Sequence, residues 1–308
     1  MRVYILTDLE GVAGVERWDP HRYGDPAARR WKDQAVELLA GEVRAAVEGA
    51  LEAGATSVLI RDGHGHGDDL PREGWPQEVE LIQGVGAGAR PGPGGGAGAG
   101  ADIGAGGWLP GLDATVDALL LVGQHAREGA ADAVLAHSWS RRRPRRCWLD
   151  GVEVGEAGAA VFLAAELGVP TAFLAGDRAA VREARDLVPG IVWAEVKRRD
   201  ERGAVVHLSG SEARKAIRAG VRRALASLPE VVAVGPAPHV FREVFVRPPL
   251  GGVPFLAARL GGGVATRALL RRAGRWPQDG RVTARVADRR TLEYRGPTVA
   301  GVLGGALG

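Results

Sequence analysis

Short apolar runs alternate with longer amphipathic stretches along most of the chain. Residues 3–6 and 57–60 are strand-like, whereas residues 27–51 repeat their apolar positions at helical spacing. Because strands connected by helices pair in parallel, this alternation predicts an α/β fold with a mostly parallel central sheet flanked by helices. Further strands are predicted at residues 79–82, 118–122, 169–174, 191–196 and 240–246, and further helices near residues 155–167, 178–187 and 211–228.

The composition changes twice along this pattern. Residues 84–107 are mostly Gly, Ala and Pro, which bury too little apolar surface to offset their ordering entropy, so a flexible surface insertion is expected there. A second change precedes two β-type runs at residues 281–286 and 291–294. The predicted organisation is an α/β domain over residues 1–235 and a smaller C-terminal α+β subdomain over residues 236–308.

Bulk composition narrows the possible functions. A chain of 308 residues that is 45% hydrophobic can bury a sizeable core. Its apolar runs are far shorter than the roughly 20 residues that cross a bilayer, and nothing like a signal peptide precedes the first strand, so a cytoplasmic protein is expected. The single cysteine, Cys147, can form neither an internal disulfide nor a thiolate zinc site, so a metal must be bound by His, Asp and Glu.

Two carboxylates follow the first predicted strand. In VYILTDLEG, Asp8 and Glu10 are two residues apart, so an extended backbone projects both to one side at the carboxyl end of the strand. Open α/β sheets bind ligands at this edge, and paired like charges require a cation. Alone, the pattern is equally consistent with ordinary loop acids or a cap before Gly11.

Histidines follow two further apolar runs. SVLIRDGHGHG places Asp62, His64 and His66 after the second strand, and ALLLVGQH places His125 after another. The carboxyl ends of parallel strands converge on one edge, which predicts a mixed His and carboxylate site suited to zinc or a similar ion. His64 is favoured as the ligand, with Asp62 orienting its imidazole and His66 as a spectator.

One more acid, Glu156, begins an Ala-rich helical stretch in VEVGEAGAAVF. The helix dipole alone favours an acid in the first turn, so Glu156 becomes a ligand candidate only together with the other four residues. Five such ligands suit two metal ions with a bridging carboxylate and a bound water.

The motifs TDLEG, DGHG, GQHA with a following LAHS, DGVEVGE and VPTAFLAGD occur in this order over the first two thirds of the chain, and in this order they resemble the DppA-type D-aminopeptidase family. The resemblance implies two zinc ions per chain and a catalytic histidine at His137. In the family, the corresponding histidine is described as the nucleophile. It also implies a ring-shaped homo-oligomer and, as substrates, short peptides with an N-terminal D-amino acid or amino-acid amides. The zinc ligands that it implies are Asp8, Glu10, His64, His125 and Glu156.

The predicted function is therefore a dinuclear zinc-dependent aminopeptidase that hydrolyses short peptides through a metal-activated water assisted by His137. His137 is expected to act as a general acid/base or to stabilise the oxyanion, because an activated water makes direct attack by the histidine unnecessary. A structural histidine beside Ser138 and Trp139 is the alternative. For the whole protein, the alternatives are a metal-dependent amidase or deacylase acting on another small amide, and a non-catalytic metal-stabilised binding protein.

The chain departs from the family pattern at residues 84–107, at Gln124, where an aromatic residue commonly precedes the ligand histidine, and in the basic run RRRPRR at residues 141–146. Most basic runs are solvated, which is the first interpretation of this one. Binding of a peptide's terminal carboxylate is the second. Nucleic acid is the third, because no aromatic stacking platform accompanies the run and the net charge is only +3.

Overall fold

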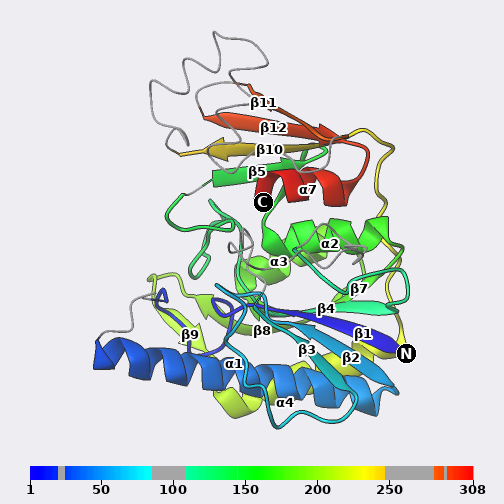
Figure 1. Cartoon of the computed structure of the whole chain (residues 1–308). Helices are drawn as coiled ribbons and strands as arrows, with labels where there is room; N and C mark the ends of the chain where they lie inside the picture. The colour runs from blue at the N-terminus through cyan, green and yellow to red at the C-terminus, as the bar shows by residue number, and fades with distance from the viewer. Residues whose placement is uncertain (20–24, 85–107, 144, 247–280, 288–289, 308) are drawn as a thin grey trace, which may run out of the picture.

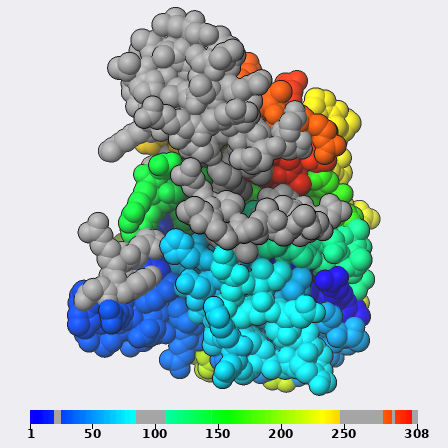
Figure 2. Space-filling view, in the orientation of Figure 1, coloured from blue at the N-terminus to red at the C-terminus, as the bar shows by residue number. Residues whose placement is uncertain are grey.

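Two β-sheets and the helices between and beside them make up the fold (Figure 1). The computed structural model describes residues 1–19, 25–84, 108–143, 145–246, 281–287 and 290–307. A mixed, mostly parallel sheet has seven strands, and a second, antiparallel sheet has five. The predicted α/β fold with a smaller C-terminal α+β portion is confirmed. The space-filling view shows the N-terminal residues (blue to cyan) at the bottom and the described C-terminal residues (orange and red) at the upper right (Figure 2).

The larger sheet has the strand order β3-β2-β1-β4-β7-β8-β9, and only the β8–β9 pair is antiparallel. The chain first moves outward from β1 to β2 and β3, and then returns to place β4 on the other side of β1. The strand order therefore reverses between β1 and β4, which is where open α/β sheets form their ligand site. The strands are β1 (Arg2–Thr7), β2 (Ser57–Arg61), β3 (Val79–Ile82), β4 (Ala118–Gln124), β7 (Thr171–Asp177), β8 (Val192–Arg199) and β9 (Val205–His207).

Helices cover both faces of this sheet. Helices α1 (Pro26–Glu52) and α4 (Gly210–Ala226) pack together on one face, and α2 (Glu156–Glu166) and α3 (Arg178–Leu187) lie on the other (Figure 1). All seven residues of β4 are buried, as expected for a strand covered on both faces. Helix α1 begins where Asp25 accepts a hydrogen bond from the Ala27 amide and Pro26 occupies the first turn.

The second sheet contains β5 (Arg145–Leu149), β6 (Val152–Val154), β10 (His239–Phe245), β11 (Thr283–Val286) and β12 (Thr291–Gly296), in the order β11-β12-β10-β5-β6. Helix α7 (Val299–Leu307) packs against it and contacts α2. Glu166 of α2 accepts hydrogen bonds from the amides of Val299 and Ala300 at 2.7 and 3.0 Å. These bonds cap α7 and connect the second sheet to the helix layer of the first.

Strands β5 and β6 lie within the range predicted for the first domain, so the chain leaves the larger sheet after β4 and returns to it through α2. The boundary between residues 235 and 236 stays a prediction. Of the Gly-rich stretch 84–107, the structure describes only Gly84. The predicted insertion itself lies outside the described residues. Within the described segments, no helix is long and apolar enough to cross a membrane.

Candidate metal centre

The five predicted ligand residues come together at the carboxyl edge of the larger sheet. Asp8 and Glu10 follow β1, His64 follows β2, His125 directly follows β4, and Glu156 is the first residue of α2. The three strands are neighbours in the sheet, and the site lies where their order reverses. Four of the side chains are buried, and that of Glu156 is 18% exposed.

The centre of the site is His125. Its Nε2 lies 3.1 Å from Asp8 Oδ2 and 3.5 Å from Glu156 Oε1, while its Nδ1 donates to the Ala126 carbonyl at 2.9 Å. Because Nδ1 carries the proton of the neutral ring, the Nε2 lone pair faces the two carboxylates. Gly123, with φ of +75°, permits this arrangement, since a Cβ there would collide with the Asp8 carbonyl.

His64 has the same arrangement on the other side of β1. Its Nε2 lies 3.4 Å from Glu10 Oε1, and its Nδ1 lies 2.6 Å from Asp69 Oδ2. Asp69 is in turn 2.7 Å from the Lys32 ammonium, which also binds Asp19 at 2.7 Å. Metal-binding histidines commonly donate their second ring nitrogen to a carboxylate in this way.

The prediction that Asp62 orients His64 is wrong. The buried Asp62 carboxylate instead accepts hydrogen bonds from the Leu70 amide at 2.8 Å and the Gln83 side chain at 3.0 Å. Asp62 therefore fixes the loop that follows β2, and this loop carries Asp69 back beside His64. His66 is exposed and lines the cavity described below, and its role as a spectator stays a prediction.

His137 joins the site from a loop. Its ring stacks on that of His125 with centroids 4.1 Å apart, its Nδ1 donates to the Leu135 carbonyl at 3.1 Å, and its Nε2 lies 3.9 Å from Glu156 Oε1. Leu135 and Trp139, on either side, have φ of 60° and 56°. Left-handed backbone at such residues is unfavourable and concentrates at functional sites.

These donors fit a divalent metal. Asp8 Oδ2, Glu10 Oε2 and His125 Nε2 are buried without a well-oriented hydrogen bond to any described residue. Their ligand atoms lie within 4.8 Å of one another, as do those of His125, His137 and Glu156. Carboxylate oxygens and neutral imidazole Nε2 atoms are the ligands that zinc uses when cysteine is absent. Unpaired buried polar atoms of this kind are costly unless a cation binds them.

Charge and burial set the proton affinities in the site. Burial, and then the Glu10 charge, raises the pKa of Asp8 to about 7. Burial also opposes ionisation of Glu10, but the charge of His64 outweighs it and holds the Glu10 pKa well below its usual value. Despite burial, the carboxylates raise the pKa of His64 and His125 well above 6.5. Burial, followed by the His125 charge, lowers the pKa of His137. Metal binding must therefore displace protons from His64 and His125.

The loop that carries Asp8 and Glu10 is held by residues that the sequence patterns do not reveal. The buried Lys197 ammonium donates to the Glu10 carbonyl, and to that of Val15 at 2.5 Å. Glu42 of α1 accepts from the Ala13 amide at 2.9 Å. Burial lowers the pKa of Lys197 to about 8 and raises that of Glu42 to about 7. In the sequence, Lys197 stands beside Arg198 and Arg199 in VWAEVKRR, so nothing in the local pattern distinguishes it as a buried residue.

A cavity of about 490 Å³ opens onto the candidate ligands. Its floor includes Asp8, Glu10, His64, His137 and Glu156. Its walls include two tryptophans in edge-to-face contact with centroids 5.9 Å apart. Such a volume holds a small organic molecule. The described wall residues are Gly63, Gly65, His66, Trp108, Trp139, Ser140, Arg141 and Arg142.

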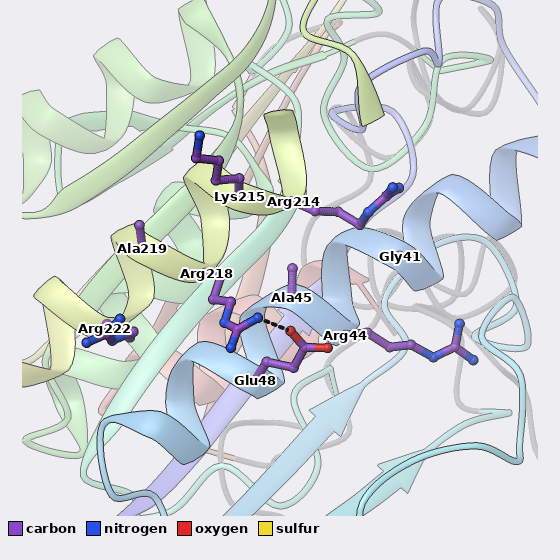
Figure 3. A pocket seen from close by; sticks show the side chains of 9 residues that line it. All are labelled: Gly41, Arg44, Ala45, Glu48, Arg214, Lys215, Arg218, Ala219 and Arg222. Atoms are coloured by element: carbon purple, nitrogen blue, oxygen red, sulfur yellow. Dashed lines mark ion pairs between the residues drawn. The ribbon is translucent and has the colours of Figure 1, made fainter. Parts of the chain in front are cut away.

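A larger cavity, of about 620 Å³, lies between α1 and α4 (Figure 3). Its described lining is dominated by basic side chains, with Glu48 as its acid, and Arg218 is already paired with Glu48 at 3.0 Å. This lining offers neither histidine nor paired carboxylates to a metal ion. The candidate site is therefore the smaller cavity, where the ligand types converge.

Comparison with known proteins identifies relatives of this chain. A family model described as D-aminopeptidase (peptidase M55) matches residues 1–90 and 106–248. The D-aminopeptidase of Bacillus subtilis (strain 168) is 28% identical over 213 residues, which cover 69% of each chain. The solved structure of the zinc-dependent D-aminopeptidase DppA from Bacillus subtilis, described as a self-compartmentalizing protease, matches with a TM-score of 0.73 at 22% identity, over 99% of this chain and 95% of that one. The family match extends over most of the chain, including every candidate ligand, and the chain belongs to the D-aminopeptidase family.

Proposed function

We propose that this protein is a dinuclear zinc-dependent aminopeptidase that hydrolyses short peptides beginning with a D-amino acid. The observation that carries the proposal is the convergence of three histidine Nε2 atoms on three carboxylates at one sheet edge. Family membership and the zinc dependence named for the solved relative support it. In this proposal, the metal ligands are Asp8, Glu10, His64, His125 and Glu156.

Two ions suit the donor set better than one. A zinc ion commonly takes four ligands, whereas five proposed ligands converge here, and each imidazole Nε2 has one lone pair and binds one ion. A ligand shared between two ions would then be a carboxylate. Asp8 is suited to that role because it is 3.1 Å from His125 Nε2 and close enough to Glu10 for their charges to interact strongly.

When bound, the metal ions would polarise the peptide carbonyl and lower the pKa of a water molecule. His137 would move the proton. The Leu135 carbonyl holds its Nδ1–H, so Nε2 is free to accept a proton, and its lowered pKa keeps the ring neutral near pH 7. The stacked His125 ring and the Glu156 carboxylate fix its position. The substrate's free amine would lie near a metal ion or an acidic side chain of the floor.

The proposal extends to assembly and location. The solved relative is described as self-compartmentalizing. We propose that this chain likewise forms a ring-shaped homo-oligomer and that it is located in the cytoplasm. Light scattering coupled to size-exclusion chromatography of the purified protein tests the assembly. A monomer at micromolar concentration would contradict it.

Hydrolysis of D-alanyl-glycine and L-alanyl-glycine tests the proposed activity. The zinc-loaded protein should release alanine from the D-isomer faster, lose activity in a chelator and regain it when zinc is returned. N-acetyl-D-alanyl-glycine separates the alternatives, because an aminopeptidase requires the free amine, whereas a deacylase accepts the blocked substrate. Failure to cleave any of these peptides, with zinc bound, would support a non-catalytic binding protein instead.

A further inference from the structure

The basic run at residues 141–146 does not form one solvated patch. Arg145 is buried in β5, with its guanidinium 2.5 Å from the Glu243 carboxylate of β10. Arg146, on the opposite face of the strand, pairs with Glu153 of β6. Solvation, the first interpretation of the run, is therefore wrong for Arg145, whose charge is compensated inside the second sheet.

Two residues earlier in the run line the candidate metal-site cavity instead. Arg141 and Arg142 both line it. The Arg141 guanidinium is held over the Trp18 ring at 5.4 Å and donates to the Asp19 carbonyl at 3.1 Å. The side chain of Arg142 is exposed and makes no hydrogen bond or ion pair with any residue that the structure describes. Arg143 is equally exposed but is not among the described residues of the cavity wall.

The cavity thus has carboxylates and histidines on its floor and an unpaired guanidinium on its wall. With a volume of about 490 Å³ it is small enough for both ends of a short peptide to contact protein at once. Two extended residues span only about 7 Å. If the amino end of a dipeptide lies at the metal ligands, its carboxyl end is the one anionic group that the substrate brings towards the wall.

We propose that Arg142 pairs with the C-terminal carboxylate of the substrate and makes the site selective for short peptides with a free carboxyl end. This inference rests on the proposed aminopeptidase activity. A guanidinium binds a carboxylate through two parallel hydrogen bonds, which fixes the orientation of the peptide as well as adding affinity. Arg141 keeps its own partners and supplies a second positive charge beside this anion.

The size of the preference for a free carboxylate distinguishes a bidentate contact with Arg142 from long-range attraction between opposite charges. An exposed ion pair changes binding by no more than about 5-fold, because solvent and salt screen it. A charge-assisted, bidentate pair inside a cavity is worth about 10- to 100-fold. A preference for the free acid that exceeds about 5-fold and depends on Arg142 therefore indicates a built contact.

The test compares D-alanyl-glycine with D-alanyl-glycinamide, which differ only in the terminal carboxylate. The kcat/KM for release of D-alanine is measured with the zinc-loaded wild type, Arg142→Gln and Arg143→Gln. The wild type should prefer the acid by more than about 5-fold, and Arg142→Gln should lose this preference mainly through a higher KM. Arg143→Gln, the matched control from the same run, should keep it.

Three results would overturn the inference. They are a wild type without preference for the acid, an Arg142→Gln variant with the wild-type preference, and an Arg143→Gln variant that loses the preference equally. In all three, D-alanine is still released and the proposed activity stands. If the wild type cleaves neither substrate, the proposed activity itself fails, and the role of Arg142 fails with it.

Discussion

Replacing Asp69 by Asn tests whether the hydrogen bond from His64 to Asp69 supports metal binding by His64. Asp69 accepts from His64 Nδ1 at 2.6 Å, and its side chain is 7% exposed, so solvent screens this contact little. Asn keeps the shape and one acceptor oxygen but removes the negative charge. Losing a carboxylate that orients a metal-binding histidine lowers metal affinity by about 10- to 100-fold, or roughly 1.4–2.7 kcal/mol.

Zinc affinity of Asp69→Asn is measured by competition with a chromogenic chelator, at a pH where the chelator is calibrated. Lys32 retains Asp19 as a partner at 2.7 Å, so the fold should survive, and circular dichroism checks this. Asp68→Asn is the matched control, because Asp68 is adjacent but exposed. Wild-type zinc affinity in Asp69→Asn, or an equal loss in Asp68→Asn, would refute the proposed role of His64 as an oriented ligand.

Two further substitutions address catalysis and stability. His125→Ala should lose bound zinc, whereas His137→Ala should keep it and lose about 100-fold or more in kcat; metal analysis and initial rates on both variants decide, and zinc loss in His137→Ala would make that residue a ligand. The raised pKa of Glu42, about 7 against an ordinary 4.5, means that the folded state favours the protonated carboxyl. The contribution to stability from this preference is fully present below pH 4.5 and is lost as pH rises through 7. Glu42→Gln, which can still accept from the Ala13 amide, should therefore match the wild type at pH 4 and exceed its unfolding free energy at pH 8 by up to about 3 kcal/mol in urea titrations; equal stability at both pH values would contradict this.

The sequence predicts the larger sheet well because burial dictates its strands. A strand covered on both faces must be apolar throughout, so the run at β4 is recognisable without its neighbours. The same logic locates Asp8, His64 and His125, since a polar side chain directly after such a strand lies at the edge of the sheet. Local sequence is enough to predict these features.

Features that depend on pairing between distant segments are not predictable in this way. In the sequence, the start of strand β5 belongs to a charged run and does not resemble a buried strand. The residue that compensates the charge of Arg145 is Glu243, which lies nearly a hundred positions later in the chain. Asp69 reaches His64 only because the loop that follows β2 folds back on itself. The prediction that Asp62 orients His64 rested on closeness along the chain and was therefore wrong. Lys197 contacts the loop after β1 from β8, which is three strands away from β1 in the sheet.

The central claim is that two metal ions bind where the strand order reverses. A crystal of the zinc-soaked protein, with data collected on both sides of the zinc absorption edge, locates these ions directly. We expect two anomalous peaks per chain, which lie among the side chains of Asp8, Glu10, His64, His125 and Glu156 and share one carboxylate. A map without a peak among these residues, in crystals that hold zinc elsewhere, would contradict the account.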